Sequence, residues 1–199
     1  QLAQQWNLES YLAIAPTVLK GEPEGRTWGY QALTSFAETH GFNGVLTAHT
    51  ASDRAETLLY NLCRGSGASG LHALQWQRPL MPDIQLVRPL LEVTRAQTGQ
   101  FCQDLGLPLW QDSMNQDKYY RRNRLRLDVL PSLRAALNPE LDTALAQTAE
   151  ILQAETDYLE GQAKQLLTQA ILNDSMQHNL LSQHPDVLAA IQQTVLQEA

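Results

Sequence analysis

The chain has 199 residues, of which 43% are hydrophobic and 18% are charged, and its formal net charge is −7 at pH 7. A chain of this length can bury a sizeable core and form one or two domains. No apolar run approaches the ~20 residues that a membrane helix needs. Cys63 and Cys102 lack the spacing of a disulfide framework or a zinc site. We therefore expect a cytoplasmic protein with reduced thiols and no membrane partner.

The charges are distributed unevenly along the chain. Residues 1–134 hold 13 basic and 12 acidic residues, whereas residues 135–199 hold only Lys164 against nine acidic residues. Six of the fourteen basic residues lie between Lys118 and Arg134. Because phosphate contacts are short-ranged at physiological salt, this local patch can bind a polyanion despite the negative net charge. The alternative is a solvated basic helix face, which charge alone favours.

The N-terminal part of the chain predicts a helix end, a strand, a loop and a helix, in that order. Residues 1–9 have the apolar spacing of a helix end, and residues 11–15 predict a strand. Residues 20–25 contain glycine and proline and predict a loop. A helix is expected from residue 26 to Gly41, a residue type that commonly follows the last helical turn.

The next segments continue the alternation of strands and helices. Residues 45–48 predict a short strand, and residues 53–64 a second helix. A strand or connector over residues 86–91 and a helix over residues 94–105 follow. This pattern indicates a parallel α/β sheet. Since four to six strands are usual, we expect only part of a doubly wound parallel sheet, and we interpret the chain as a fragment that lacks preceding residues.

The character of the sequence changes after Asn138-Pro139. Leucines recur there at helical spacing among Ala, Gln and Glu, without any strand pattern. We therefore expect two domains, an α/β domain over residues 1–128 and a small all-helical domain over residues 129–199.

Polar side chains gather where the second predicted strand hands over to its helix. In open α/β sheets, ligands bind beyond the carboxyl ends of the strands, where helix N-termini attract anions. Asp53 and Glu56 are one helical turn apart, so together they can hold an ammonium group or a magnesium ion. His49 can contact phosphate or transfer a proton, because its unperturbed pKa lies near neutrality. The alternative is an acidic N-cap at Asp53 with Glu56 three residues later.

Two further segments carry groups suited to phosphate or RNA. The run Arg64-Gly65-Ser66-Gly67 opens a loop rich in backbone N–H groups that can surround a phosphate or a base, although it is also typical of a helix C-terminus.

Farther along, Arg122 and Arg126 are four residues apart and share one helix face, where arginine can clamp phosphate in bidentate fashion. Asn123 can hydrogen-bond a base or a carboxyl group, and Tyr119 and Tyr120 add stacking surfaces suited to RNA. The alternative is a helix capped by Asp117, with the arginines paired to Asp112 and Asp128.

Taken in chain order, these segments resemble the tRNA(Ile)-lysidine synthetase family of PP-loop enzymes over residues 10 to about 155. The residues that carry the resemblance are Glu24, Arg26 and Tyr30; His49, Asp53, Glu56 and Thr57; Arg64 to Leu71; Arg88 to Leu91 with Thr94 and Arg95; Trp110, Asp112 and Asn115; and Arg122, Asn123 and Arg126.

The resemblance implies an α/β domain of the PP-loop type followed by a small helical domain. It also implies a ligase activity: ATP adenylates the wobble cytidine of a tRNA(Ile) with a CAU anticodon, and free lysine then displaces AMP to give lysidine. The implied ligands are ATP, Mg²⁺, lysine and the tRNA. Asp53, Glu56 and Arg122 would be catalytic, with the two carboxylates binding the cationic lysine and Arg122 near the phosphates or the lysine carboxylate. The implied substrate-binding residues are Arg26, His49, Arg64, Gly65, Ser66, Gly67, Asn123 and Arg126.

The chain also departs from the family pattern. The phosphate-binding signature Ser-Gly-Gly-x-Asp-Ser does not occur in it, so no residue is assigned to ATP and no metal ligand is assigned with certainty. Thr50 and Ser52 stand where many relatives carry His and Asp, and Gly29 stands where a basic residue is common. We expect a catalytically incomplete fragment whose uncovered apolar helix faces favour self-association. Two alternatives stay open: a tRNA-thiolating PP-loop relative and a non-catalytic RNA-binding module.

Overall fold

The computed structural model describes residues 2–19, 21–71, 73–109, 113–172 and 186. The chain divides into two compact units. The first comprises Gln1–His49 with Trp76–Leu90, and the second comprises Thr50–Gln75 with Leu91–Ala199. Among the described residues, none of the helices is long and apolar enough to cross a membrane.

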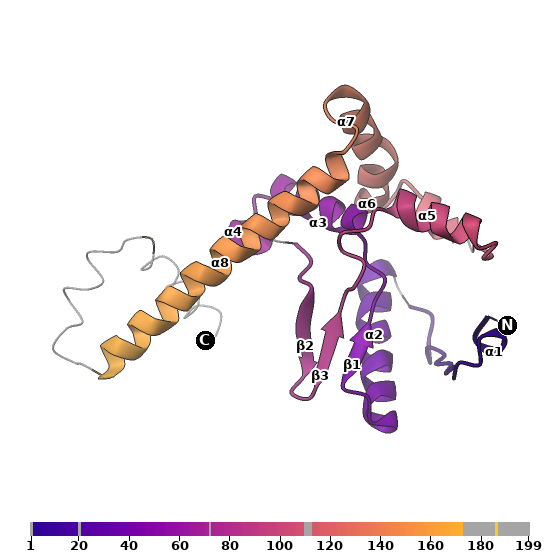
Figure 1. Ribbon diagram of the computed structural model, residues 1–199, viewed down its shortest axis with the longest axis horizontal. Coiled ribbons are helices and arrows are strands. Elements are labelled where there is room, and N and C mark those ends of the chain that lie inside the picture. Colours follow the sequence, from indigo (N-terminus) through magenta and orange to yellow (C-terminus); the bar gives the residue numbers. More distant parts are fainter. Residues whose placement is uncertain (1, 20, 72, 110–112, 173–185, 187–199) are drawn as a thin grey trace. The chain divides into compact units, whose positions relative to one another are not determined.

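The first unit is a three-stranded sheet with one long helix beside it (Figure 1). The sheet has the order β1-β3-β2, formed by β1 (Gly44–Leu46), β2 (Gln77–Met81) and β3 (Ile84–Val87). Strands β1 and β3 are parallel, and β2 is antiparallel to β3. The helices of this unit are α1 (Leu2–Gln5) and α2 (Gly21–His40).

A small apolar cluster holds α2 against this sheet. Ala37 of α2 is buried together with Val45 of β1 and with Ile84 and Leu86 of β3. Val45 and Leu86 are also register partners in the parallel ladder, so the same residues close the sheet and its helix. Strand β1 confirms the strand predicted over residues 45–48, and its parallel pairing with β3 agrees with the predicted parallel sheet.

Strand β2 was not predicted from the sequence, because it contains Pro79. Proline donates no ladder hydrogen bond and is confined to edge strands, so it argues against a strand assignment. In the sheet β2 lies at an edge, where Pro79 is the register partner of Gln85. The sheet is consequently mixed, with an antiparallel hairpin added to the expected parallel pair.

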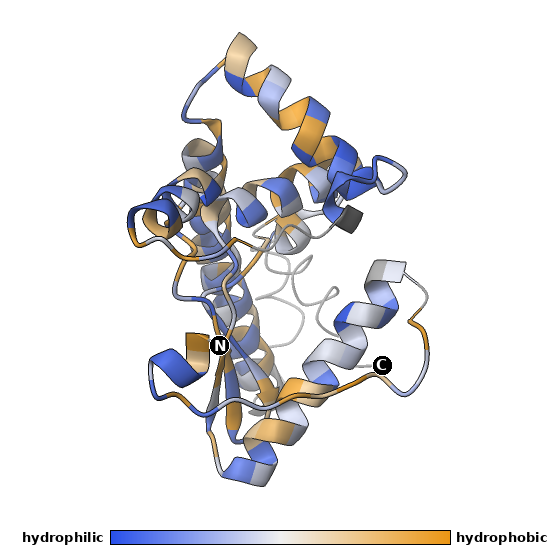
Figure 2. Cartoon of the chain, turned by 90° about the vertical axis from the view of Figure 1, so that its right-hand side faces the viewer, coloured by the Kyte–Doolittle hydropathy of each residue, from blue (hydrophilic) through white to orange (hydrophobic). Residues whose placement is uncertain are grey.

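Two predictions for the N-terminal segments are wrong. Residues 11–15 form no strand, because the segment pairs with no strand among the described residues. Its apolar side chains are not buried either, since Leu12 and Ile14 are 83% and 81% exposed. Much of the segment between α1 and α2 is coloured as hydrophobic in Figure 2. The described part of the predicted loop, residues 21–25, instead begins helix α2. Pro23 is compatible with this position, because proline lacks a backbone N–H and the first turn of a helix does not use one.

The second unit is helical. Its elements are α3 (Ala51–Cys63), α4 (Ala68–Leu71), α5 (Arg95–Asp104), the 3-10 helix η1 (Ser113–Gln116), α6 (Arg121–Arg124), the π-helical turn η2 (Leu125–Val129), α7 (Leu130–Ala136) and α8 (Leu141–Leu172). Helices α3 and α8 pack against each other (Figure 1), and small buried residues such as Ala55 and Ala149 lie on these helices.

The helical character predicted after Asn138-Pro139 is confirmed by α8, which begins at Leu141. The helix predicted over residues 94–105 is confirmed by α5, whose N-cap is Thr94. The domain boundary placed between residues 128 and 129 stays a prediction.

Candidate functional site

The start of helix α3 is fixed by a reciprocal capping arrangement. Thr50 is the N-cap, and its hydroxyl oxygen accepts a hydrogen bond from the backbone N–H of Asp53 at 3.3 Å. In return, Oδ2 of Asp53 accepts hydrogen bonds from the backbone N–H of Thr50 at 2.8 Å and from its hydroxyl at 2.7 Å. The interpretation of Asp53 as the N-cap is therefore wrong by three residues. Glu56 lies one turn farther on and takes no part in capping.

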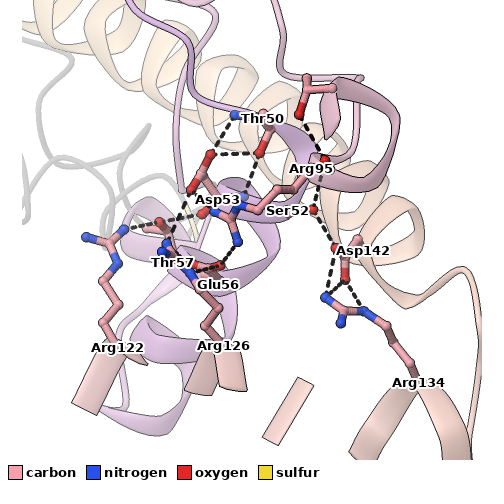
Figure 3. Close-up of polar contacts among 11 residues, drawn as sticks. Thr50, Ser52, Asp53, Glu56, Thr57, Arg95, Arg122, Arg126, Arg134 and Asp142 are labelled. Atoms are coloured by element: carbon pink, nitrogen blue, oxygen red, sulfur yellow. Dashed lines mark hydrogen bonds and ion pairs between the residues drawn. The ribbon is translucent and has the colours of Figure 1, made fainter. Parts of the chain in front are cut away.

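Glu56 is buried and clasped by two arginines (Figure 3). Its side chain is 1% exposed, and both carboxylate oxygens accept hydrogen bonds from Arg126, from Nε at 2.8 Å and from Nη2 at 2.7 Å. Oε1 also accepts from Nη1 of Arg95 at 2.8 Å. A carboxylate buried to this extent needs such partners, since an isolated buried charge is strongly unfavourable.

Asp53 shares the same arginines. Its Oδ1 accepts a hydrogen bond from Nη2 of Arg95 at 2.6 Å and lies 3.6 Å from Nη2 of Arg126. We call these four residues, Asp53, Glu56, Arg95 and Arg126, the acid–arginine cluster. It joins helix α3 to the first turn of α5 and to the π-helical turn η2, so three segments distant in sequence meet at one point.

The environment of Asp53 favours its charged form. Burial raises the pKa of this carboxyl, but the hydrogen bonds from Thr50 and the positive charges of Arg95 and Arg126 outweigh burial, so the pKa lies below its usual value. Asp53 is more accessible than Glu56, with a side chain that is 18% exposed. It is therefore the carboxylate of the cluster that an incoming cation can reach.

Arg122 contacts the same helix one turn farther along. Its Nη2 donates a hydrogen bond of 2.8 Å to the hydroxyl of Thr57, which itself donates to the backbone carbonyl of Asp53. The prediction that Arg122 and Arg126 share one helix face is thus confirmed, because both reach α3. Asn123 behaves differently, since its amide donates to the backbone carbonyl of Asp117, which precedes α6.

The glycine-rich loop lies at the opposite end of α3. Arg64 is the C-cap of the helix, Gly65 has a left-handed φ of 75°, and the backbone N–H of Ser66 donates to the carbonyl of Asn61. At 1.5 Å per residue, the 13 residues of α3 separate this loop from Asp53 by about 15–20 Å. Arg64, Gly65, Ser66 and Gly67 therefore form a helix C-terminus, and the structure does not bring them to the acid–arginine cluster.

Two of the predicted site residues belong to the first unit. His49 lies next to the N-cap in sequence, and its Nδ1 is 2.9 Å from the hydroxyl of Thr47. Arg26 lies on α2, with its guanidinium carbon 5.8 Å from the centre of the Tyr30 ring. Their roles stay predictions.

Sequence reasoning missed a second polar group beside the cluster. The hydroxyl of Ser52 accepts from the backbone N–H of Arg95 at 3.1 Å and donates to Oδ2 of Asp142 at 2.6 Å. Arg134 clasps the same carboxylate with Nε at 2.9 Å and Nη2 at 3.0 Å. Residues that are 90 apart in sequence give no spacing signal, and only the Thr94-Arg95 helix start could have suggested that Arg95 lies near α3.

A cavity of about 600 Å³ opens next to both groups. Its lining includes Ser52, Arg95, Arg126, Arg134 and Asp142. The two arginines of the acid–arginine cluster, Arg95 and Arg126, therefore line a space large enough for a small polar ligand.

The acidic residues here do not fit a magnesium ion. Both carboxylates of the cluster are already engaged by guanidinium groups. Within the described ranges, no group of three or more His, Cys, Asp or Glu side chains is arranged to hold a metal. The chemistry of this cluster is accordingly that of arginine and carboxylate.

Known proteins similar to this chain point to one family. Residues 2–133 match the family model of the PP-loop domain, which is named for ATP binding. The chain is 51% identical over its full length to the tRNA(Ile)-lysidine synthase of Nostoc sp.. It is 46% identical to that of Synechococcus sp. and 43% identical to that of Synechocystis sp., over 98% and 99% of the chain. It spans 58%, 59% and 61% of the length of these three relatives.

Among solved structures, the U34-tRNA thiolase NcsA of Methanococcus maripaludis has a similar fold. The TM-score is 0.57 with 12% sequence identity, and the similarity covers 76% of this chain and 53% of the thiolase chain. Together with the family match, this likeness confirms the predicted α/β fold of the PP-loop type with an added helical part.

Proposed function

The chain belongs to the PP-loop family, and from this premise we propose that it is part of an enzyme that attaches lysine to the wobble cytidine of a tRNA(Ile) with a CAU anticodon. The observation that carries the proposal is the similarity to tRNA(Ile)-lysidine synthases along the whole chain. In the proposed reaction, ATP adenylates the cytidine with release of pyrophosphate, and the amine of lysine then displaces AMP. The substrates are ATP with its Mg²⁺, free lysine and the tRNA, in the cytoplasm.

The acid–arginine cluster supports a role in holding lysine. Asp53 is a charged carboxylate whose side chain is 18% exposed, and its partners Arg95 and Arg126 line a cavity. A carboxylate of this kind suits a primary ammonium group. Arg95 now occupies that side of Asp53, and its own side chain is 43% exposed. We propose that the lysine ammonium takes the place of the Arg95 guanidinium at Asp53, while the buried Glu56 keeps Arg126 in position.

The other predicted residues complete the proposal. Arg122, which donates a hydrogen bond to Thr57 beside the cluster, would bind a phosphate or the carboxylate of lysine. Arg26, His49 and Asn123 would contact the nucleotide or the tRNA. The loop Arg64 to Gly67 lies at the opposite end of α3 from the cluster, so it would contact the tRNA and not the lysine.

The experiment follows labelled lysine into CAU-anticodon tRNA(Ile) with ATP, using the complete protein that contains this chain, and measures pyrophosphate release in parallel. We expect incorporation by the parent protein. Asp53→Asn should raise the KM for lysine at least about tenfold, the loss of one charged hydrogen bond, while pyrophosphate release continues. Asp128→Asn, in an exposed ion pair with Lys118, is the matched control and should behave like the parent.

Absence of incorporation by a parent protein that binds the tRNA would refute the proposal and favour an RNA-binding module.

Thiolation is tested separately with a Cys63→Ala, Cys102→Ala protein, since both cysteines are free and lie on α3 and α5. Unchanged lysine incorporation by that variant excludes a role for these thiols. Self-association, which the exposed Leu12 and Ile14 side chains favour, is tested by light scattering.

A further inference from the structure

Three arginines surround one tyrosine in the first unit. Arg26 and Tyr30 lie one turn apart on α2, Arg78 belongs to β2, and Arg88 directly follows β3. The guanidinium carbons of Arg26 and Arg78 lie 5.8 Å and 5.2 Å from the centre of the Tyr30 ring, within the range of cation–π attraction. We call Arg26, Arg78 and Arg88 the arginine cluster.

Arg88 is the buried anchor of this cluster. Its side chain is 2% exposed, and it hydrogen-bonds to the hydroxyl of Tyr30. Burial lowers the pKa of Arg88, and the nearby charges of Arg78 and Arg26 lower it further, although the contact with Tyr30 opposes both effects. Tyr30 itself is partly buried and packs against the apolar cluster that holds α2 to the sheet.

Two arginines of this cluster, Arg26 and Arg78, have no acidic partner in the part of the chain that the structure describes. The second unit shows the opposite pattern, since Arg54, Arg95, Arg126 and Arg134 each bind an acidic side chain.

The positive charge of the cluster lowers the pKa of the Tyr30 hydroxyl. Burial raises the pKa of this hydroxyl, yet the hydrogen bond from Arg88 and the charge of Arg26 outweigh burial and lower it. Guanidinium groups that gather around one ring repel one another, and an anion placed among them would relieve that repulsion.

We propose that the arginine cluster binds a backbone phosphate of RNA. Guanidinium groups offer forked donors that match phosphate oxygens, and the Tyr30 hydroxyl adds a further donor close by. Arg26 is exposed and Arg78 half-buried, so the ligand is met at the surface, as suits the phosphate of a polymer. If the proposed function holds, the RNA is the substrate tRNA, and the contact positions it without reading its sequence.

The test measures binding of CAU-anticodon tRNA(Ile) and of ATP to the complete protein at several salt concentrations. We expect Arg78→Gln to weaken tRNA binding about fivefold at physiological salt, the upper range for one exposed ion pair. The slope of log K against log salt should decrease by about 1 for the lost phosphate contact. ATP binding should not change. Arg26→Gln, on an exposed residue, should act in the same way if Arg78→Gln disturbs the sheet.

Lys164→Gln is the control, because it removes one exposed positive charge from α8, outside the cluster. A loss of ATP binding with unchanged tRNA binding would overturn the proposal and assign the cluster to a nucleotide phosphate. Equal salt slopes for the parent, Arg26→Gln and Arg78→Gln proteins would overturn it as well. Both outcomes are read from binding alone, so they are independent of whether lysine is incorporated.

Discussion

Replacing Glu56 by glutamine removes the charge that two arginines share while nearly preserving the size of the side chain. The carboxylate accepts three hydrogen bonds from guanidinium groups at 2.7–2.8 Å, and its side chain is only 1% exposed. Breaking a fully buried pair in this way costs about 3–5 kcal/mol. Since Arg95 and Arg126 are 43% and 26% exposed, water can solvate them in part. We therefore expect a loss of about 2–3 kcal/mol in the free energy of unfolding.

Urea denaturation followed by circular dichroism measures this loss. With an m-value of about 2–3 kcal/mol/M for a chain of this size, the midpoint should fall by about 1 M. Asp128→Asn provides the matched comparison, because Asp128 and Lys118 form an ion pair of 2.6 Å whose side chains are 48% and 58% exposed. That change should cost less than about 0.5 kcal/mol. If Glu56→Gln costs no more than Asp128→Asn, the argument from burial is refuted.

Three further predictions concern the same unit. The pKa of Asp53 is lowered in the folded protein, so its contribution to stability should be complete above the unfolded value of about 3.9 and be lost as the pH falls through the folded value. The stability difference between the parent and Asp53→Asn should therefore shrink only below about pH 4, and a difference that shrinks above that pH would contradict the assignment. Ser52→Ala and Asp142→Asn should be coupled by at least about 0.5 kcal/mol in a double-mutant cycle, because they share a hydrogen bond of 2.6 Å; additive effects would show that this bond contributes nothing. Arg54 is 2% exposed, and its Nε and Nη2 atoms have no hydrogen-bond partner among the described residues, so Arg54→Met should change the unfolding free energy by less than about 1 kcal/mol. A loss twice as large in thermal or urea unfolding would show that the charge is needed.

Local signals in the sequence were sufficient for some elements and not for others. Gly41 and Thr94 mark helix boundaries through backbone chemistry that acts within a few residues, and helices α2 and α5 end and begin there. The register of α3 was misjudged because Thr50, Ser52 and Asp53 are all suitable caps, and only the fold decides among them. Residues 11–15 carry an apolar pattern, but a strand also needs a partner, which a pattern does not supply.

In the candidate site as well, local spacing could be predicted from the sequence, whereas contacts between distant residues could not. The pairing of Asp53 with Glu56 and of Arg122 with Arg126 follows from helical spacing, which sequence alone reveals. That Arg126 and Arg95 bind these carboxylates could not be predicted, because the partners are 70 and 39 residues from Glu56 along the chain. Contacts of this kind depend on how helices pack, and the charges themselves carry no information about which acid each arginine will meet.

The π-helical turn η2 has a consequence for how this part of the chain can evolve. The backbone N–H of Leu130 bonds to the carbonyl of Leu125, five residues earlier, and Pro131 follows without any N–H of its own. One extra residue in the turn rotates everything after it by about 100° around the helix axis. Before the turn, Arg122 contacts Thr57 of α3. After the turn, Leu130 is buried and Arg134 contacts Asp142. Side chains here can be exchanged one at a time, but the number of residues between Arg122 and Arg134 is fixed by geometry, so this segment should accept substitutions far more readily than insertions or deletions.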